Sequence, residues 1–135
     1  RVLARDDTPD APDIRARLGA VALIRFDRLL ENDGRPMTFE RLWFDAGRFP
    51  QVADRVASGG SFFAALREQA GVVPAHAERQ IDVGQPTDAE RAVLEIGLGQ
   101  PVFRIEKIVT DAGGGPLALS RLVTPGHLVS YVLKT

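Results

Sequence analysis

The stretch LLENDGRPMTFERLWF, residues 29–44, contains two runs of strand-forming residues joined by an Asn-Asp-Gly turn. Glycine tolerates the positive φ that a tight hairpin turn requires. The run before the turn extends back to residue 20, and the run after it covers residues 36–44. Strands joined by such a turn pair antiparallel. This stretch therefore predicts a sheet built around a β-hairpin.

An internal repeat extends this prediction to the C-terminal half. The segment GRPMTFERL (34–42) aligns without a gap with GGPLALSRL (114–122), and both contain Gly, Pro, Arg and Leu at matching positions. Upstream, the residue pairs at 10–11 and 18–19 resemble the pairs at 88–89 and 96–97. Turn chemistry alone could make two hairpins alike, but the match reaches into the preceding helices. The sequence therefore predicts two pseudo-repeated halves, each running strand, helix, strand, hairpin, strand.

The remaining segments show the usual signals for strands and helices. Strands are predicted at residues 1–5, 76–83, 101–111 and 116–123, the last two joined by a Gly-rich turn. Helices are predicted at residues 8–19, 49–57, 61–71 and 87–97. Ser61 is expected to cap the third helix, and Thr87 with Glu90 to form a capping box at the fourth. We expect one α+β domain, residues 1–135, with helices covering one face of a mostly antiparallel sheet.

The composition excludes several classes of protein. The chain has 135 residues, 44% of them hydrophobic and 26% charged, which is typical of one globular domain. With 17 basic against 18 acidic side chains, it lacks the positive surplus that binds nucleic acid. The chain has no cysteine, which excludes disulfides and thiolate metal sites and fits a cytoplasmic protein. No apolar run approaches the ~20 residues that span a membrane. The first residue is Arg1 and not Met, so we expect a preceding segment.

No motif of catalysis or metal binding stands out. Neither His76 nor His127 has a second ligand at metal-site spacing. Ser61 lies in GGSFF, which lacks the G-x-S-x-G frame of a nucleophile elbow. We therefore expect a protein that is not an enzyme and that uses no metal and no cofactor.

Polar residues within apolar strands are the better candidates for a binding site. The candidates are three charged residues, each with apolar residues on both sides: Arg28 between Phe26 and Leu29-Leu30, Glu40 between Phe39 and Leu42 with Arg41 beside it, and Arg121 between Leu119 and Leu122. Some of them could simply face water, since strand side chains alternate between faces. If they converge, a guanidinium can grip a carboxylate or phosphate with two parallel hydrogen bonds. Ser61, at a predicted helix start after two glycines, offers free amides to an anion, or else is an ordinary cap.

Several segments in this order resemble the UTRA domain, the C-terminal effector-binding module of HutC-subfamily GntR transcription regulators. They are FDRLLENDGRPMTFE, FDAGRFP, SFFAALREQAG, VFRIEKIVTDAGGGPL and LSRLVTPGHLVSY. The resemblance implies a chorismate-lyase-like fold that binds a small-molecule effector, in a homodimer. It also implies a winged helix-turn-helix that precedes this chain and binds DNA. Two other functions stay open, a chorismate-lyase-like enzyme and a pure dimerisation module.

The same resemblance implies a set of ligand-binding residues. By motif, Arg28 matches a ligand-facing Arg, Glu40 an acidic residue on the returning strand, and Ser61 a helix-start Ser that holds an anion. We add Phe62, Arg121 and Tyr131 as candidates. Sugar-phosphate sensors often have a second Arg where this chain has Leu30, so we expect a less charged effector. We also expect Arg28→Ala to weaken effector binding with little loss of fold.

Overall fold

The predicted hairpin forms as expected in the computed structural model, which describes residues 1–135. Strand β2 (Leu23–Asn32) pairs antiparallel with β3 (Arg35–Asp45). Between them Asp33 and Gly34 have φ angles of 51° and 76°. Two successive positive φ angles define the turn whose twist matches that of the flanking strands.

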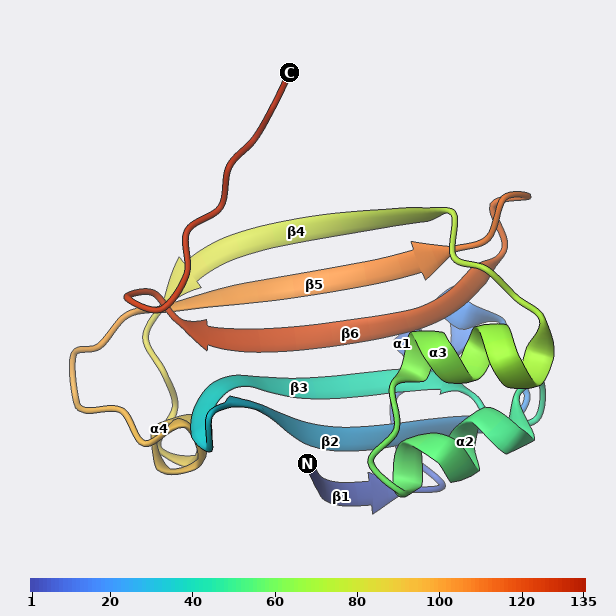
Figure 1. Cartoon of the computed structure of the whole chain (residues 1–135), viewed down its shortest axis with the longest axis horizontal. Helices are drawn as coiled ribbons and strands as arrows, with labels where there is room; N and C mark the ends of the chain where they lie inside the picture. Colours follow the sequence, from blue (N-terminus) through green and yellow to red (C-terminus); the bar gives the residue numbers. More distant parts are fainter.

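Six antiparallel strands form one sheet (Figure 1). The other four strands are β1 (Val2–Asp6), β4 (His76–Gly84), β5 (Val102–Thr110) and β6 (Pro116–Pro125). Their order across the sheet is β1-β2-β3-β6-β5-β4. The two hairpins, β2–β3 and β5–β6, therefore meet at the centre of the sheet. The predicted α+β fold with an antiparallel sheet is confirmed.

The sequence repeat corresponds to a pseudo-two-fold relation between the halves. The repeat aligns Arg41 with Arg121, and these two residues are direct partners across the central β3–β6 pair. Arg41 is also paired with Asp27 on β2, and Arg121 with Glu106 on β5. Each half thus places an acidic residue beside its central arginine, and the predicted duplication is confirmed.

Helices lie on both faces of the sheet. On one face, called the α2–α3 face below, Ile24 and Phe44 pack against α2 (Pro50–Ala57), α3 (Phe62–Ala65) and the π-helical turn η1 (Leu66–Ala70). On the other, the α1–α4 face, Leu23 and Trp43 pack against α1 (Pro12–Leu18). Leu29 packs at the opposite end of that face against α4 (Asp88–Leu94).

The expectation that helices cover a single face is therefore wrong. Leu23 and Ile24 are neighbours that point to opposite faces, yet they are only 1% and 2% exposed. A strand with apolar side chains on both sides needs cover on both sides. No helix in the structure has the length and apolar character needed to cross a bilayer.

Helix ends differ from the prediction in three places. Helix α1 begins after Ala11, and not at Thr8, and has no side-chain cap. The predicted helix over residues 61–71 forms as α3 and η1 in succession, and ends at Gly71 with a φ of 66°. Helix α4 stops at Leu94 because Glu95 takes a left-handed conformation before Gly97 is reached.

Replacing Thr87 with alanine is expected to lower the free energy of unfolding by about 1 kcal/mol. The capping box is present: Oγ1 of Thr87 accepts a hydrogen bond from the amide of Glu90, and Oε1 of Glu90 accepts one from the amide of Thr87. Urea denaturation measures the loss. Thr8→Ala is the control, since the Thr8 side chain caps no helix; equal losses in both variants would contradict the role of the box.

Candidate functional site

An ion pair between β2 and β3 is the centre of the candidate site. Arg28 and Glu40 are direct partners in the antiparallel register. Nε of Arg28 donates a hydrogen bond of 2.7 Å to Oε1 of Glu40, and Nη2 contacts the same oxygen. The two side chains are 15% and 5% exposed. The two residues that the sequence singled out first therefore lie together on the α2–α3 face.

Lys107 on β5 adds a second positive charge to this face. It is half-buried, and its Nζ lies 5.2 Å from the centre of the Phe63 ring, within range of a cation–π contact. Burial lowers the pKa of Lys107, while the nearby charge of Glu40 acts to raise it. Its direct partner on β4 is Arg79. Three cations thus share a region with a single carboxylate, so the region favours an anion.

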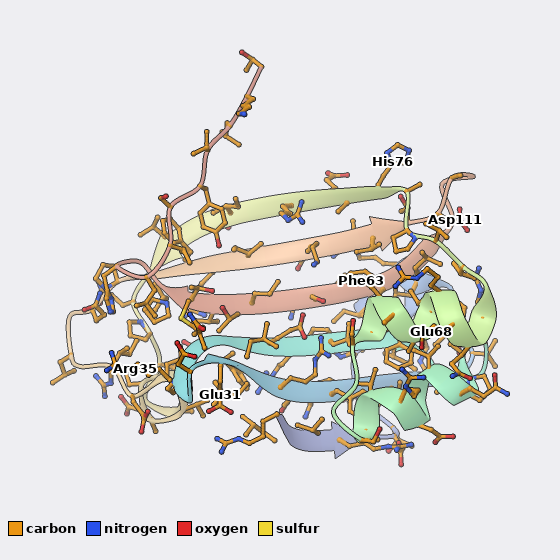
Figure 2. The ribbon with its side chains drawn as sticks, viewed as in Figure 1. Glu31, Arg35, Phe63, Glu68, His76 and Asp111 are labelled. Atoms are coloured by element: carbon orange, nitrogen blue, oxygen red, sulfur yellow. The ribbon has the colours of Figure 1, made fainter.

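This region is the part of the α2–α3 face that the helices leave uncovered. Helices α2 and α3 lie over one end of the sheet, where β3 ends (Figure 1). Phe63 projects from α3 over the strands (Figure 2) and is 38% exposed. Tyr131 stands edge-on to Phe103, with ring centres 5.0 Å apart, and burial raises its pKa. The cations are therefore accompanied by three partly exposed aromatic rings.

Five hollows of about 220 to 830 Å³ lie elsewhere on the molecule. The candidate site is an open patch on the α2–α3 face. Its assignment rests on the charges and rings that it brings together.

Two further candidates lie near the start of α3. Ser61 is exposed, and its Oγ accepts a hydrogen bond from the amide of Ala64, which confirms its role as a helix cap. Phe62 is only 2% exposed and packs against Phe44, with ring centres 5.0 Å apart. Phe62 therefore belongs to the core, and its neighbour Phe63 is the residue that reaches the open face.

Arg121 does not join Arg28 and Glu40. Its strand partner Arg41 is adjacent to Glu40 in the chain, so Arg41 and Arg121 point to the opposite side of the sheet. There Nε of Arg121 donates a hydrogen bond of 3.2 Å to Glu106. The six sequence candidates are thus divided between the two faces and the core.

Sequence reasoning missed Lys107, Arg79 and Phe63. The segment VFRIEKIVT alternates, and the register of β5 with β6 decides which of its residues share a face with Glu40. That register differs by one residue from the one that an ungapped repeat would give, because the two hairpin turns differ. No local pattern in the sequence reveals this difference.

Comparison with known proteins agrees with the fold and with the resemblance found in the sequence. Residues 1–130 match the family model described as the UTRA domain. The chain is 26% identical over 137 residues to the HTH-type transcriptional regulator YurK of Bacillus subtilis strain 168, covering 99% of this chain and 57% of YurK. The crystal structure of the C-terminal domain of YurK superposes with a TM-score of 0.86, covering 99% of this chain and 94% of that domain.

Two other relatives carry functional names. A protein of Escherichia coli K12 named "Probable fructoselysine utilization operon transcriptional repressor" is 26% identical over 106 residues, covering 78% of this chain and 44% of that protein. The ligand-binding domain of a GntR-family transcriptional regulator from Bordetella bronchiseptica has the same fold, with a TM-score of 0.85 at 18% identity, covering 100% of this chain and 90% of that domain. The chain spans about half the length of the curated relatives it matches. This chain belongs to the UTRA family of effector-binding domains found in GntR-type transcription regulators.

Proposed function

We propose that this domain senses a small organic anion on the open part of its α2–α3 face, as part of a HutC-type regulator. The observation that carries the proposal is the grouping of Arg28, Lys107 and Arg79 around the single carboxylate of Glu40. Fixed cations in a partly desolvated place attract an anion more strongly than the same charges in water. The partly exposed rings of Phe63 and Tyr131 add apolar surface for the rest of the ligand.

The chemistry of this patch refines the expectation of a weakly charged effector. Leu30 stands where related sugar-phosphate sensors have a second arginine, and it is 39% exposed. Lys107 and Arg79, which reach the same face from strands β5 and β4, supply positive charge in its place. A carboxylate attached to an apolar or aromatic body fits this combination of two free cations and three rings better than a sugar phosphate does.

In the whole protein, the effector would act through DNA-binding domains that precede this chain. The curated relatives are about twice as long as the match and are named as transcriptional regulators. In a homodimer, effector binding would change the spacing of the two DNA-binding domains. The coupling free energy between the effector site and the DNA site is typically ~1–3 kcal/mol. Such a regulator works in the cytoplasm, where the DNA is.

Two other functions fit the fold less well. An enzyme related to chorismate lyase needs an acid or base poised at the site, but Glu40 is held by Arg28 in a tight ion pair. The curated relatives are named as regulators and not as enzymes. Dimerisation alone does not require three cations on an uncovered face. We therefore propose a sensor without catalytic activity.

Lys107→Met is expected to abolish the stabilisation of this chain by its effector while leaving the fold intact. The lysine is half-buried and its charge is disfavoured by burial, so its removal costs the fold little. Thermal unfolding against a panel of small carboxylates and phosphates measures the effect, since a ligand at 100 times its Kd adds ~2.7 kcal/mol to stability.

Lys134→Met is the matched control, because Lys134 is the other lysine of the chain and is exposed. An anion that stabilises the wild type and the Lys134 variant, but not the Lys107 variant, supports the proposal. Equal stabilisation of all three proteins would place the effector elsewhere. If no anion stabilises the wild type, the proposal that the effector is an anion is wrong.

A further inference from the structure

A second candidate site lies on the α1–α4 face, on the other side of the sheet from Arg28. It is a hollow of about 330 Å³ beside helix α4, with strands β3, β5 and β6 as its floor. Its apolar lining consists of Phe39, Ala89, Val93 and Val123. Two arginines from the central strands, Arg41 and Arg121, line the same hollow. The α2–α3 face has no part in it.

The two arginines lie where the pseudo-two-fold relation brings like charges together. Arg41 and Arg121 are direct partners across β3 and β6, and their side chains are 50% and 54% exposed. Like charges directly opposite each other on neighbouring strands destabilise a sheet. Asp27 and Glu106 each lie beside one of these arginines and offset part of the repulsion, and an anion placed between the arginines would relieve the rest.

Most of the hydrogen-bond donors of these two guanidinium groups have no partner within the chain. Nε of Arg41 lies 3.6 Å from Oδ1 of Asp27, which is too far for a hydrogen bond. Arg121 uses only Nε, in its bond to Glu106. Oδ1 of Asp27 instead lies 3.0 Å from Nε of Arg25, in an ion pair. The terminal amino groups of both arginines are therefore available to a ligand.

A third arginine that lines the hollow already has hydrogen-bond partners within the chain and is held in place by them. Arg104 donates hydrogen bonds to both carboxylate oxygens of Glu90, at 2.9 and 2.6 Å, and to the carbonyl of Gln85 at 2.8 Å. Burial alone would raise the pKa of Glu90, but the hydrogen bonds from Arg104 and Thr87 outweigh it and lower the pKa. This pair is charge-neutral, so the attraction for an anion comes from Arg41 and Arg121.

We propose that this hollow binds a small organic carboxylate, held by Arg41 and Arg121 with its apolar body on Phe39 and Val123. The planar fork of a guanidinium matches a carboxylate, and two such forks side by side can hold both oxygens. The volume is at the lower limit for pockets that hold small ligands, which suits a body of one ring or a short chain. This site is separate from the effector site and does not depend on it.

Isothermal titration with phenylacetate, and with phenylacetamide as its uncharged counterpart, tests the proposal. We expect phenylacetate to bind the wild-type chain and phenylacetamide not to bind. The double variant Arg41→Gln/Arg121→Gln should weaken phenylacetate binding by about tenfold or more, because each lost charged hydrogen bond contributes to affinity. Removing a like-charge pair leaves the fold intact, which circular dichroism checks.

The variant Lys107→Met separates this site from the one on the opposite face. We expect it to keep the phenylacetate binding that requires Arg41 and Arg121, and to lose only what the α2–α3 face contributes. The proposal is overturned if phenylacetate does not bind the wild type at millimolar concentration, if phenylacetamide binds equally well, or if the double variant binds normally. If the double variant instead changes the molar mass of the protein in solution, these arginines belong to an interface between copies of the chain, and the proposal is again wrong.

Discussion

Replacing Arg28 with methionine is expected to lower the free energy of unfolding by about 3 to 5 kcal/mol, because it leaves the charge of Glu40 buried without its partner. Glu40 is 5% exposed, and Arg28 is its only hydrogen-bond donor in the chain. The expectation that Arg28 could be removed with little loss of fold, drawn from the sequence alone, does not allow for this pairing. A loss of effector binding in this variant would therefore report on folding as well as on recognition.

A double-mutant cycle separates the two effects. The double variant Arg28→Met/Glu40→Leu removes both charges and should recover most of the lost stability, since a buried ion pair can be replaced by apolar side chains at little cost. Urea denaturation measures all four proteins, with Arg35→Met as the control for a loss of one exposed arginine. If the double variant is no more stable than Arg28→Met, the cost does not come from an unpaired Glu40.

Phe44→Ala is expected to have a comparable effect for a different reason. Phe44 is fully buried, stacks on Phe26 with ring centres 6.0 Å apart, and contacts Phe62 on α3. Removing a buried phenylalanine leaves a cavity and typically costs about 3 to 5 kcal/mol. Because Phe44 joins α3 to the sheet, the variant should also displace Phe63 from the open face and weaken effector binding.

Phe63→Ala is the matched control for this prediction. Phe63 is 38% exposed and lies one residue beyond Phe62, so its removal should cost much less stability while still reducing effector affinity. Denaturation and ligand-induced thermal shifts compare the two variants. Equal losses of stability would show that Phe44 does not hold α3 in place.

The elements that sequence could predict are those set by local chemistry. The Asn-Asp-Gly turn fixes the first hairpin, and the capping box at Thr87 fixes the start of α4. The repeat predicted the second half because both hairpins have a glycine and a proline near the turn and an arginine at the matching position of the returning strand. The pairing of Arg28 with Glu40 was not predicted, because an irregularity between Leu30 and Glu31 shifts the register that the turn alone would set.

The parts that failed depend on contacts between distant elements. Whether Phe62 or Phe63 faces the core is decided by the rotation of α3 against Phe44, and one residue of helix turns the side chain by about 100°. Arg121 lies on the far side from Arg28 because the register of β3 with β6 places it opposite Arg41. Lys107 reaches the site only through the β5–β6 register. None of these relations has a local sequence signal.

A crystal structure of this chain with the anion that stabilises it most tests the central claim directly. The account predicts electron density for the anion on the α2–α3 face, with its charged group within hydrogen-bond distance of Arg28 or Lys107 and its apolar part against Phe63. Density for that anion anywhere else, with these side chains unchanged and uncontacted, would contradict it.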